Sequence, residues 1–143
     1  MRVYFDASVM AAFALRESTA PALIRWIRER AQGATPTFSD FGRGEVASAS
    51  SLRVRGGHIS EDKAREALLL LDVDLAYCEP TFVLASDIEF ARSFVLRFEL
   101  GLRLPDAIHI AIAHRIGATL LSLDKRQVAG ARSLGIEAAD PLA

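Results

Sequence analysis

Four acidic residues that are far apart in the sequence are candidates to act together at one site: Asp6, Glu45, Asp106 and Asp124. Asp6 and Asp124 each directly follow an apolar run, and Asp106 follows Pro105 at the start of a helical pattern. Carboxylate oxygens, without Cys or His among them, suit Mg²⁺ or Mn²⁺ better than zinc. If these acids meet in space, the sequence predicts a site for one of these cations.

The chemistry that such a site supports is phosphodiester hydrolysis. A divalent cation activates a water molecule and neutralises charge on the phosphate, so no nucleophilic side chain is needed, and none is evident. Each Asp alone has a structural explanation, because Asp commonly caps a helix or complements its dipole. Two carboxylates about 4 Å apart, however, repel by roughly 4 kcal/mol at an effective dielectric of 20. Four acids at one place therefore favour a bound cation.

The acids are positioned by apolar runs that alternate with helical patterns along the chain. We expect strands at residues 2–5, 35–38, 75–78, 118–123 and 136–138. Helices are expected at residues 7–16, 21–31, 40–53, 60–74, 81–100, 105–116 and 125–134. Strands separated by helices predict an α/β fold, with a parallel sheet of about five strands and helices on both faces. Without repeats or linkers, residues 1–143 are expected to form one domain.

Right-handed crossovers bring the carboxyl ends of parallel strands and the first turns of the covering helices to one edge of the sheet. Asp6, Asp106 and Asp124 are expected at this edge, and Glu45 lies one to two turns into the helix after the second strand.

Three further residues are expected to support these acids. Ser8 and Ser122 are each two residues from an acid, and their hydroxyls either orient a ligand or satisfy nearby backbone. His109 is one turn beyond Asp106 on the same helix face. It could contact a phosphate or a metal-bound water, or it could be a buried, hydrogen-bonded histidine.

Other polar residues carry weaker arguments. Arg53 and Arg55, with His58, are candidates to contact an RNA backbone from a Gly-rich loop, and an ordinary exposed loop is the alternative. Of the remaining acids, Asp72 and Asp74 are expected in a turn at the opposite edge of the sheet. Asp87 and Glu89 are expected on the surface of the long helix. Glu79 is expected at the same edge as the four acids but on a strand outside the site, and is a reserve candidate only.

Bulk composition narrows the class of protein. The net charge of −1 gives no general attraction to nucleic acid. No stretch without Asp, Glu, Lys and Arg is longer than residues 7–15, far short of the roughly 18 residues of a membrane span. Asp6 interrupts any signal sequence almost at once, and the single cysteine, Cys78, excludes a disulfide within the chain. The expected compartment is the cytoplasm.

The sequence resembles the PIN-domain family. The resemblance is carried by Val-Tyr-Phe-Asp6-Ala-Ser8, by Glu45 early in the third helix, by Leu104-Pro-Asp106-Ala-Ile-His-Ile-Ala-Ile-Ala113 and by Leu120-Leu-Ser-Leu-Asp124-Lys-Arg. The length and the order of these motifs are similar to the VapC-type toxins of bacterial and archaeal toxin–antitoxin pairs, and the similarity covers essentially the whole chain.

The resemblance implies a PIN-like fold and a Mg²⁺- or Mn²⁺-dependent endoribonuclease that acts on tRNA, rRNA or mRNA. It also implies a homodimer, inhibited by a small VapB-type antitoxin whose tail occupies the acidic groove. The alternative is a non-catalytic partner of a DNA-binding antitoxin, which tunes repression. One departure is that Gly42 and Gly44 flank Arg43 just before Glu45. Each glycine costs a helix ~1 kcal/mol relative to Ala, which predicts a loose turn there.

Two other phosphate-handling folds are disfavoured. A haloacid-dehalogenase phosphatase needs a second Asp two residues after the first, where Ser8 stands. A phospho-receiver domain needs an Asp at the end of its third strand and a Lys at the end of its fifth, where Cys78 and Ala138 stand.

Overall fold

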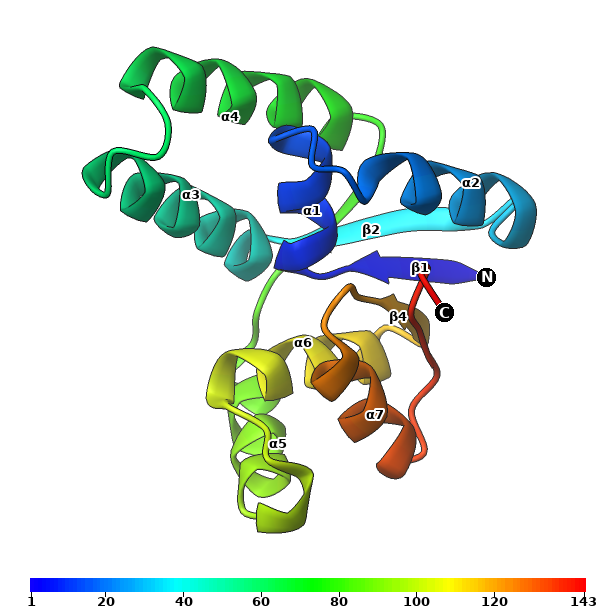
Figure 1. Ribbon diagram of the computed structural model, residues 1–143. Coiled ribbons are helices and arrows are strands. Elements are labelled where there is room, and N and C mark those ends of the chain that lie inside the picture. Colours follow the sequence, from blue (N-terminus) through cyan, green and yellow to red (C-terminus); the bar gives the residue numbers. More distant parts are fainter.

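Five parallel strands form one sheet at the centre of the molecule, in the order β3-β2-β1-β4-β5 (Figure 1). The computed structural model describes residues 1–143. Its strands are β1 (Arg2–Phe5), β2 (Thr35–Ser39), β3 (Glu79–Thr81), β4 (Ala118–Leu121) and β5 (Ala138–Ala139). In the middle, Arg2 of β1 stands opposite Thr35 of β2 on one side and Ala118 of β4 on the other. The predicted parallel α/β architecture is confirmed.

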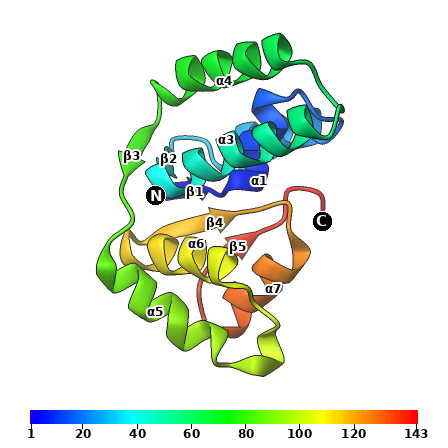
Figure 2. The same cartoon turned by 90° about the vertical axis from the view of Figure 1, so that its left-hand side faces the viewer.

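The helices cover both faces of this sheet (Figures 1 and 2). On one face lie α1 (Ala7–Ala14), α2 (Ala20–Arg30), α3 (Asp40–Arg55) and α4 (Glu61–Leu75). On the other face lie α5 (Ala85–Val95), the short 3₁₀ helix η1 (Phe98–Leu100), α6 (Leu104–Arg115) and α7 (Lys125–Ser133). None of the helices combines the length and the apolar character that crossing a bilayer requires.

Each face of the sheet packs its own hydrophobic core, because side chains alternate along a strand. Val3 and Phe5 of β1 point into a cluster with α1, α2, α3 and α4. Tyr4, between them, points to the other cluster, which α5, α6 and α7 complete. α6 is central to this second cluster: Ala107, Ile108 and residues 110–113 are all buried. This helix is covered all round, and its position is correspondingly fixed.

The chain between α4 and α6 differs from the prediction. The apolar run at residues 75–78 is not a strand: α4 extends to Leu75, and β3 begins only at Glu79, paired with Thr37 of β2. A sequence of Glu-Pro-Thr has little β propensity of its own, so the pairing with β2 determines this strand. The expected long helix at residues 81–100 is divided into α5 and η1, and η1 ends at Gly101 in the left-handed region, with φ 61°.

The weaker acids lie elsewhere than expected. Asp72 belongs to α4 rather than to a turn, and accepts two hydrogen bonds from Arg43 of α3. Glu79 begins β3 and pairs with Arg2 at the start of β1, 3.3 Å away. It therefore lies at the strand beginnings, and its place as a reserve candidate at the acidic edge was wrong.

Asp87 was expected on the surface, and this expectation was wrong as well. Its side chain is only 2% exposed, and it accepts hydrogen bonds from the backbone N–H of Leu84 and from Arg115 at the end of α6. Arg115 also donates to the carbonyl of Phe82. This buried ion pair joins the start of α5 to the end of α6.

Candidate active site

The carboxyl ends of β1, β2 and β4 lie at one edge of the sheet, the side that faces the viewer in Figure 2. Asp6 directly follows β1 and begins α1 as its N-cap, and its backbone N–H donates to Leu121 of β4, at 3.3 Å. Asp124 follows β4 and is the N-cap of α7. Asp106 lies in the first turn of α6, the helix that leads into β4. Strand and helix ends therefore bring these three acids to the same edge.

Asp6 is the most buried of the acids, with 2% of its surface exposed. Its Oδ1 accepts hydrogen bonds from the Ser8 hydroxyl at 2.6 Å and from the backbone N–H of Val9 at 3.0 Å. Its Oδ2 accepts one from the Ser122 hydroxyl, also at 2.6 Å. Ser8 and Ser122 in turn accept hydrogen bonds from the backbone N–H groups of Leu123 and Asp124. The two serines thus orient this carboxylate and join the loop after β4 to it.

The electrostatics of Asp6 are unfavourable. Burial raises the pKa of its carboxyl above the usual range, and this effect exceeds the opposing effects of the nearby His109 and of the three hydrogen bonds. All three hydrogen bonds come from neutral groups, which compensate only part of the cost of removing a carboxylate from water. A divalent cation at this carboxylate would supply the missing charge.

Glu45 and His109 belong to one hydrogen-bonded chain. Nε2 of His109 is bonded to the Glu45 carboxylate, and Nδ1 lies 2.7 Å from the Tyr4 hydroxyl. The Tyr4 hydroxyl lies 2.7 Å from Oγ of Ser39, the last residue of β2. Tyr4, Ser39 and His109 are buried, whereas the Glu45 side chain is 30% exposed at the end of this chain. Burial also raises the pKa of Tyr4 well above its usual value, so its hydroxyl stays protonated.

The other two acids are bonded locally. Asp106 is buried and accepts a hydrogen bond from the backbone N–H of Arg103, whose guanidinium lies 3.5 Å from the same carboxylate oxygen. Asp124 is half-buried and accepts hydrogen bonds from the backbone N–H groups of Arg126 and Gln127.

Asp6, Asp106 and Asp124 therefore share an edge, and Glu45 of α3 is joined to His109 of α6. No three His, Cys, Asp or Glu side chains are arranged as the ligands of a single ion. The donor set nevertheless fits Mg²⁺ or Mn²⁺: every candidate ligand is a carboxylate oxygen, and Asp6 is a buried charge with neutral partners only.

Tyr4 and Ser39 are parts of this site that the sequence analysis missed. The available signal was the spacing of Tyr4 two residues before Asp6, because side chains two apart in an extended segment point to the same side. Ser39 ends the neighbouring strand and caps α3 by accepting the N–H of Gly42 at 3.0 Å.

Gly42 and Gly44, which predicted a loose turn, lie within the continuous helix α3. A Cβ on Gly42 would meet Met10 Cε at 2.7 Å, His109 Cε1 at 3.2 Å and Ser39 Oγ at 3.3 Å, whereas a Cβ on Gly44 would meet nothing within 4 Å. A Cβ on Gly42 would thus crowd Met10 first and His109 and Ser39 next, whereas a Cβ on Gly44 would have open space.

This contrast predicts opposite effects on stability. Gly44→Ala should raise the free energy of unfolding by up to about 1 kcal/mol, the helix-propensity difference. Gly42→Ala should lower it by about 1 kcal/mol or more, because overpacking typically costs ~1–3 kcal/mol. Urea denaturation of both variants measures the two values. Equal stabilisation by both substitutions would contradict the close packing of Gly42 against Met10 and His109.

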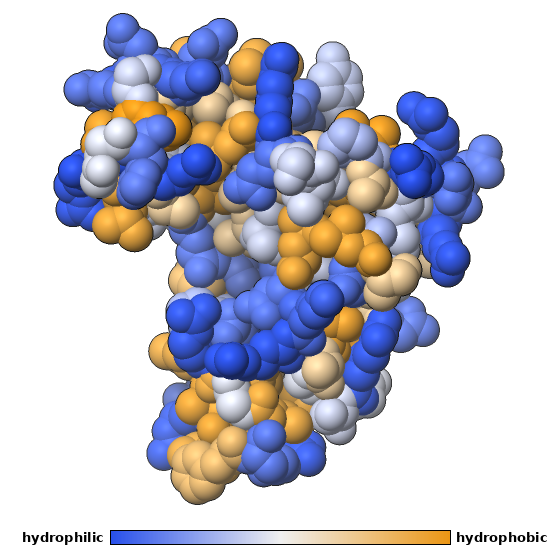
Figure 3. Space-filling view, viewed as in Figure 1, coloured by the Kyte–Doolittle hydropathy of each residue, from blue (hydrophilic) through white to orange (hydrophobic).

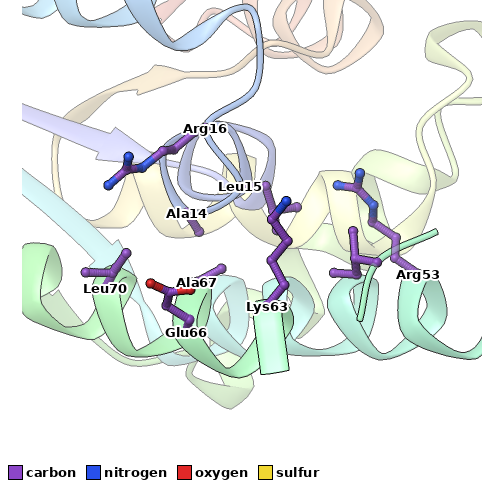
Figure 4. A pocket seen from close by; sticks show the side chains of 9 residues that line it. Ala14, Leu15, Arg16, Arg53, Lys63, Glu66, Ala67 and Leu70 are labelled. Carbon is purple, nitrogen blue, oxygen red and sulfur yellow. The ribbon is translucent and has the colours of Figure 1, made fainter. Parts of the chain in front are cut away.

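Arg53 and Arg55 lie in the last turn of α3 rather than on a loop. Arg53 lines a pocket of about 500 Å³ together with Arg16, Lys63, Glu66 and apolar side chains that include Ala14 of α1 and Leu70 of α4 (Figure 4). Eight residues of helix separate Arg53 from Glu45, which is about 12 Å along the axis. The structure therefore places these arginines at the opposite end of α3 from the acids, beside a separate pocket.

At the edge where the acids lie, the surface is indented. In Figure 3, drawn from the same side as Figure 1, the outline narrows on the left between the part formed by α3 and α4 and the part formed by α5 and α6, and most of the surface there is hydrophilic. An extended polar ligand could reach the strand ends at this place.

Comparison with known proteins agrees with this architecture. The family model of the PIN domain matches residues 3–132. A search of the curated proteins finds no relative of the sequence.

Solved structures match over nearly the whole chain. A protein from Pyrobaculum aerophilum is 22% identical, with a TM-score of 0.67, over 99% of this chain and 86% of its own. VapBC2 from Rickettsia felis, solved with a fragment of its promoter DNA, is 14% identical, with a TM-score of 0.72, over 97% of this chain and 98% of its own. VapC20 from Mycobacterium tuberculosis, a toxin that cleaves the sarcin–ricin loop, is 19% identical, with a TM-score of 0.65, over 89% and 93%. At these identities the likeness establishes the fold alone.

Proposed function

Since the chain belongs to the PIN-domain family, we propose that it is a Mg²⁺- or Mn²⁺-dependent endoribonuclease and the toxin of a VapBC-type toxin–antitoxin pair. The observation that carries the proposal is the buried Asp6 carboxylate, whose hydrogen bonds all come from neutral donors, at an edge shared with Asp106 and Asp124. A buried carboxylate without a cationic partner destabilises a fold. A role in binding a cation accounts for its presence.

In this proposal Asp6, Glu45, Asp106 and Asp124 hold the cation, which supplies charge neutralisation at the scissile phosphate and a more acidic water. Ser8 and Ser122 orient the Asp6 carboxylate, each through a 2.6 Å hydrogen bond. His109 orients Glu45. Arg53 and Arg55 remain candidates for contact with RNA outside the acidic edge.

The proposed partner is a small antitoxin of the VapB type, and the proposed assembly is a homodimer. Support for the antitoxin comes from the similarity in fold to VapBC2 of Rickettsia felis, which is itself a toxin–antitoxin complex. The rival function is a non-catalytic partner of a DNA-binding antitoxin. That role needs no buried carboxylate at a sheet edge, so Asp6 favours the nuclease.

The test is cleavage of single-stranded RNA by the purified protein with Mg²⁺ or Mn²⁺, and with EDTA as the metal-free control. We expect cleavage that EDTA stops and that Asp106→Asn reduces by more than about tenfold. Asn keeps an oxygen for the N–H of Arg103, so the helix start is preserved. Asp74→Asn, in α4, is the matched control and should cleave as the wild type does. Undiminished cleavage by Asp106→Asn would contradict the proposed site.

A further inference from the structure

We infer that Tyr4 and Ser39 are positioning residues for Glu45, which they orient through His109 by a one-directional chain of hydrogen bonds. The inference deepens the proposed function and rests on it, because it treats Glu45 as a metal ligand. Four elements contribute to the chain: Ser39 ends β2, Tyr4 lies in β1, His109 in α6 and Glu45 in α3.

The direction of the chain follows from the donors and acceptors available. The Glu45 carboxylate can only accept, so the His109 nitrogen bonded to it, Nε2, carries a proton. In a neutral imidazole the other nitrogen, Nδ1, is then an acceptor, and the Tyr4 hydroxyl donates to it. The Tyr4 oxygen in turn accepts from the Ser39 hydroxyl.

The hydrogen-bonded chain begins and ends at the same helix, α3. Oγ of Ser39 accepts the backbone N–H of Gly42 in the first turn of α3, and Glu45 lies in the next turn of that helix. With this assignment every polar group of the chain donates and accepts without conflict. With the proton on Nδ1 instead, two acceptors would face each other at Nε2 and Glu45. The buried network therefore admits one imidazole tautomer only.

Packing limits the His109 ring to the orientation that this chain needs. The ring centroid lies 5.7 Å from that of Tyr4 and 5.3 Å from that of Phe41. Gly42 leaves just enough room for the ring edge at Cε1, the carbon between the two nitrogens. A ring that packs against two aromatic side chains and Gly42 and is hydrogen-bonded at both nitrogens cannot turn without breaking the bond to Glu45. Removing a residue that is hydrogen-bonded to a metal ligand commonly weakens metal affinity by about 10–100-fold.

The first readout is the tautomer of His109, measured by ¹⁵N NMR on protein labelled at histidine. His58 and His114 are the only other histidines, so the signals are assigned with His109→Gln. At a pH where the ring is neutral we expect its proton on Nε2, and a slowly exchanging Nε2 proton that broadens or disappears in Tyr4→Phe. A proton on Nδ1, or a Tyr4→Phe spectrum identical to that of the wild type, would overturn the chain.

The second readout is Mn²⁺ affinity, measured by electron paramagnetic resonance. Tyr4→Phe removes one hydroxyl and should weaken binding by about tenfold or more. Tyr77→Phe is the matched control, since Tyr77 is 86% exposed, and should leave the affinity unchanged. His109→Gln keeps an amide donor for Glu45 and should bind Mn²⁺ more tightly than His109→Leu.

The two proposals fail in different ways. No Mn²⁺ binding by the wild type would contradict the proposed function, and with it the positioning role. Mn²⁺ binding that is equal in the wild type and Tyr4→Phe, or equal in His109→Gln and His109→Leu, would contradict the positioning role alone. Melting curves of each variant without metal establish that the compared proteins are folded.

Discussion

Replacing Asp6 with Asn is expected to abolish metal-dependent RNA cleavage and, at the same time, to raise the melting temperature of the metal-free protein. Asn has nearly the same shape and keeps an oxygen for the N–H of Val9, and it is also an effective N-cap. It removes, however, a buried carboxylate whose hydrogen bonds all come from neutral groups and whose pKa is raised by burial. We expect a gain of about 1–2 kcal/mol, or roughly 3–6 °C, by calorimetry in EDTA.

The dependence of this gain on pH identifies its cause. The pKa of Asp6 in the folded protein lies above its usual value, so the folded state binds the proton more tightly than the unfolded state does. Stability of the wild type therefore falls as the pH rises through the folded pKa. Asp6→Asn has no such proton, so the difference between the two proteins should vanish at low pH and be largest at neutral pH. A difference that is independent of pH would contradict burial of the charge as the cause.

Removing Arg115 is expected to destabilise the fold more than any other exchange of a polar side chain considered above. Arg115→Met leaves the Asp87 carboxylate, 2% exposed, without a cationic partner. Breaking a buried ion pair from one side typically costs about 3–5 kcal/mol. Because the Arg115 side chain is itself 31% exposed, water screens part of the interaction, and we expect a loss of about 3 kcal/mol. A decrease in melting temperature of about 10 °C should follow.

Arg65→Met is the matched control for this experiment. Arg65 and Glu61 pair at 2.9 Å within α4, but their side chains are 73% and 67% exposed. Exposed pairs contribute about 0–1 kcal/mol, so this variant should melt within a few degrees of the wild type. Asp87→Asn should fall between the two, because it removes the buried charge and leaves unpaired only Arg115, whose side chain is 31% exposed to water. Similar losses for Arg115→Met and Arg65→Met would show that burial does not determine the strength of these pairs.

The architecture was accessible from the sequence because it depends on local patterns. Apolar runs alternating with helical periodicity predicted a parallel sheet covered on both faces, and strand ends placed Asp6 and Asp124 at helix starts. The exceptions depend on partners far along the chain. β3 exists through pairing with β2, and Asp87 is buried by Arg115, 28 residues later. Neither partner can be read from the residues around these positions.

The site shows the same division. Ser8 and Ser122 were predicted as partners of an acid because they lie two residues from one, and both are hydrogen-bonded to Asp6. The space at Gly42 is limited instead by Met10 of α1 and His109 of α6, which approach from other helices. The sequence therefore predicted a loose turn before Glu45, whereas the structure has a continuous, closely packed helix there.

The central claim, that acids at this sheet edge bind a divalent cation, is tested most directly by titrating the metal-free protein with Mn²⁺ in a calorimeter. Asp124→Asn keeps the N-cap of α7 and removes one carboxylate, and Asp74→Asn removes a carboxylate of α4 as the control. We expect binding by the wild type and Asp74→Asn with equal affinity, and binding weakened by about tenfold or more in Asp124→Asn. Equal affinity in all three proteins, or no binding by the wild type, would contradict the claim.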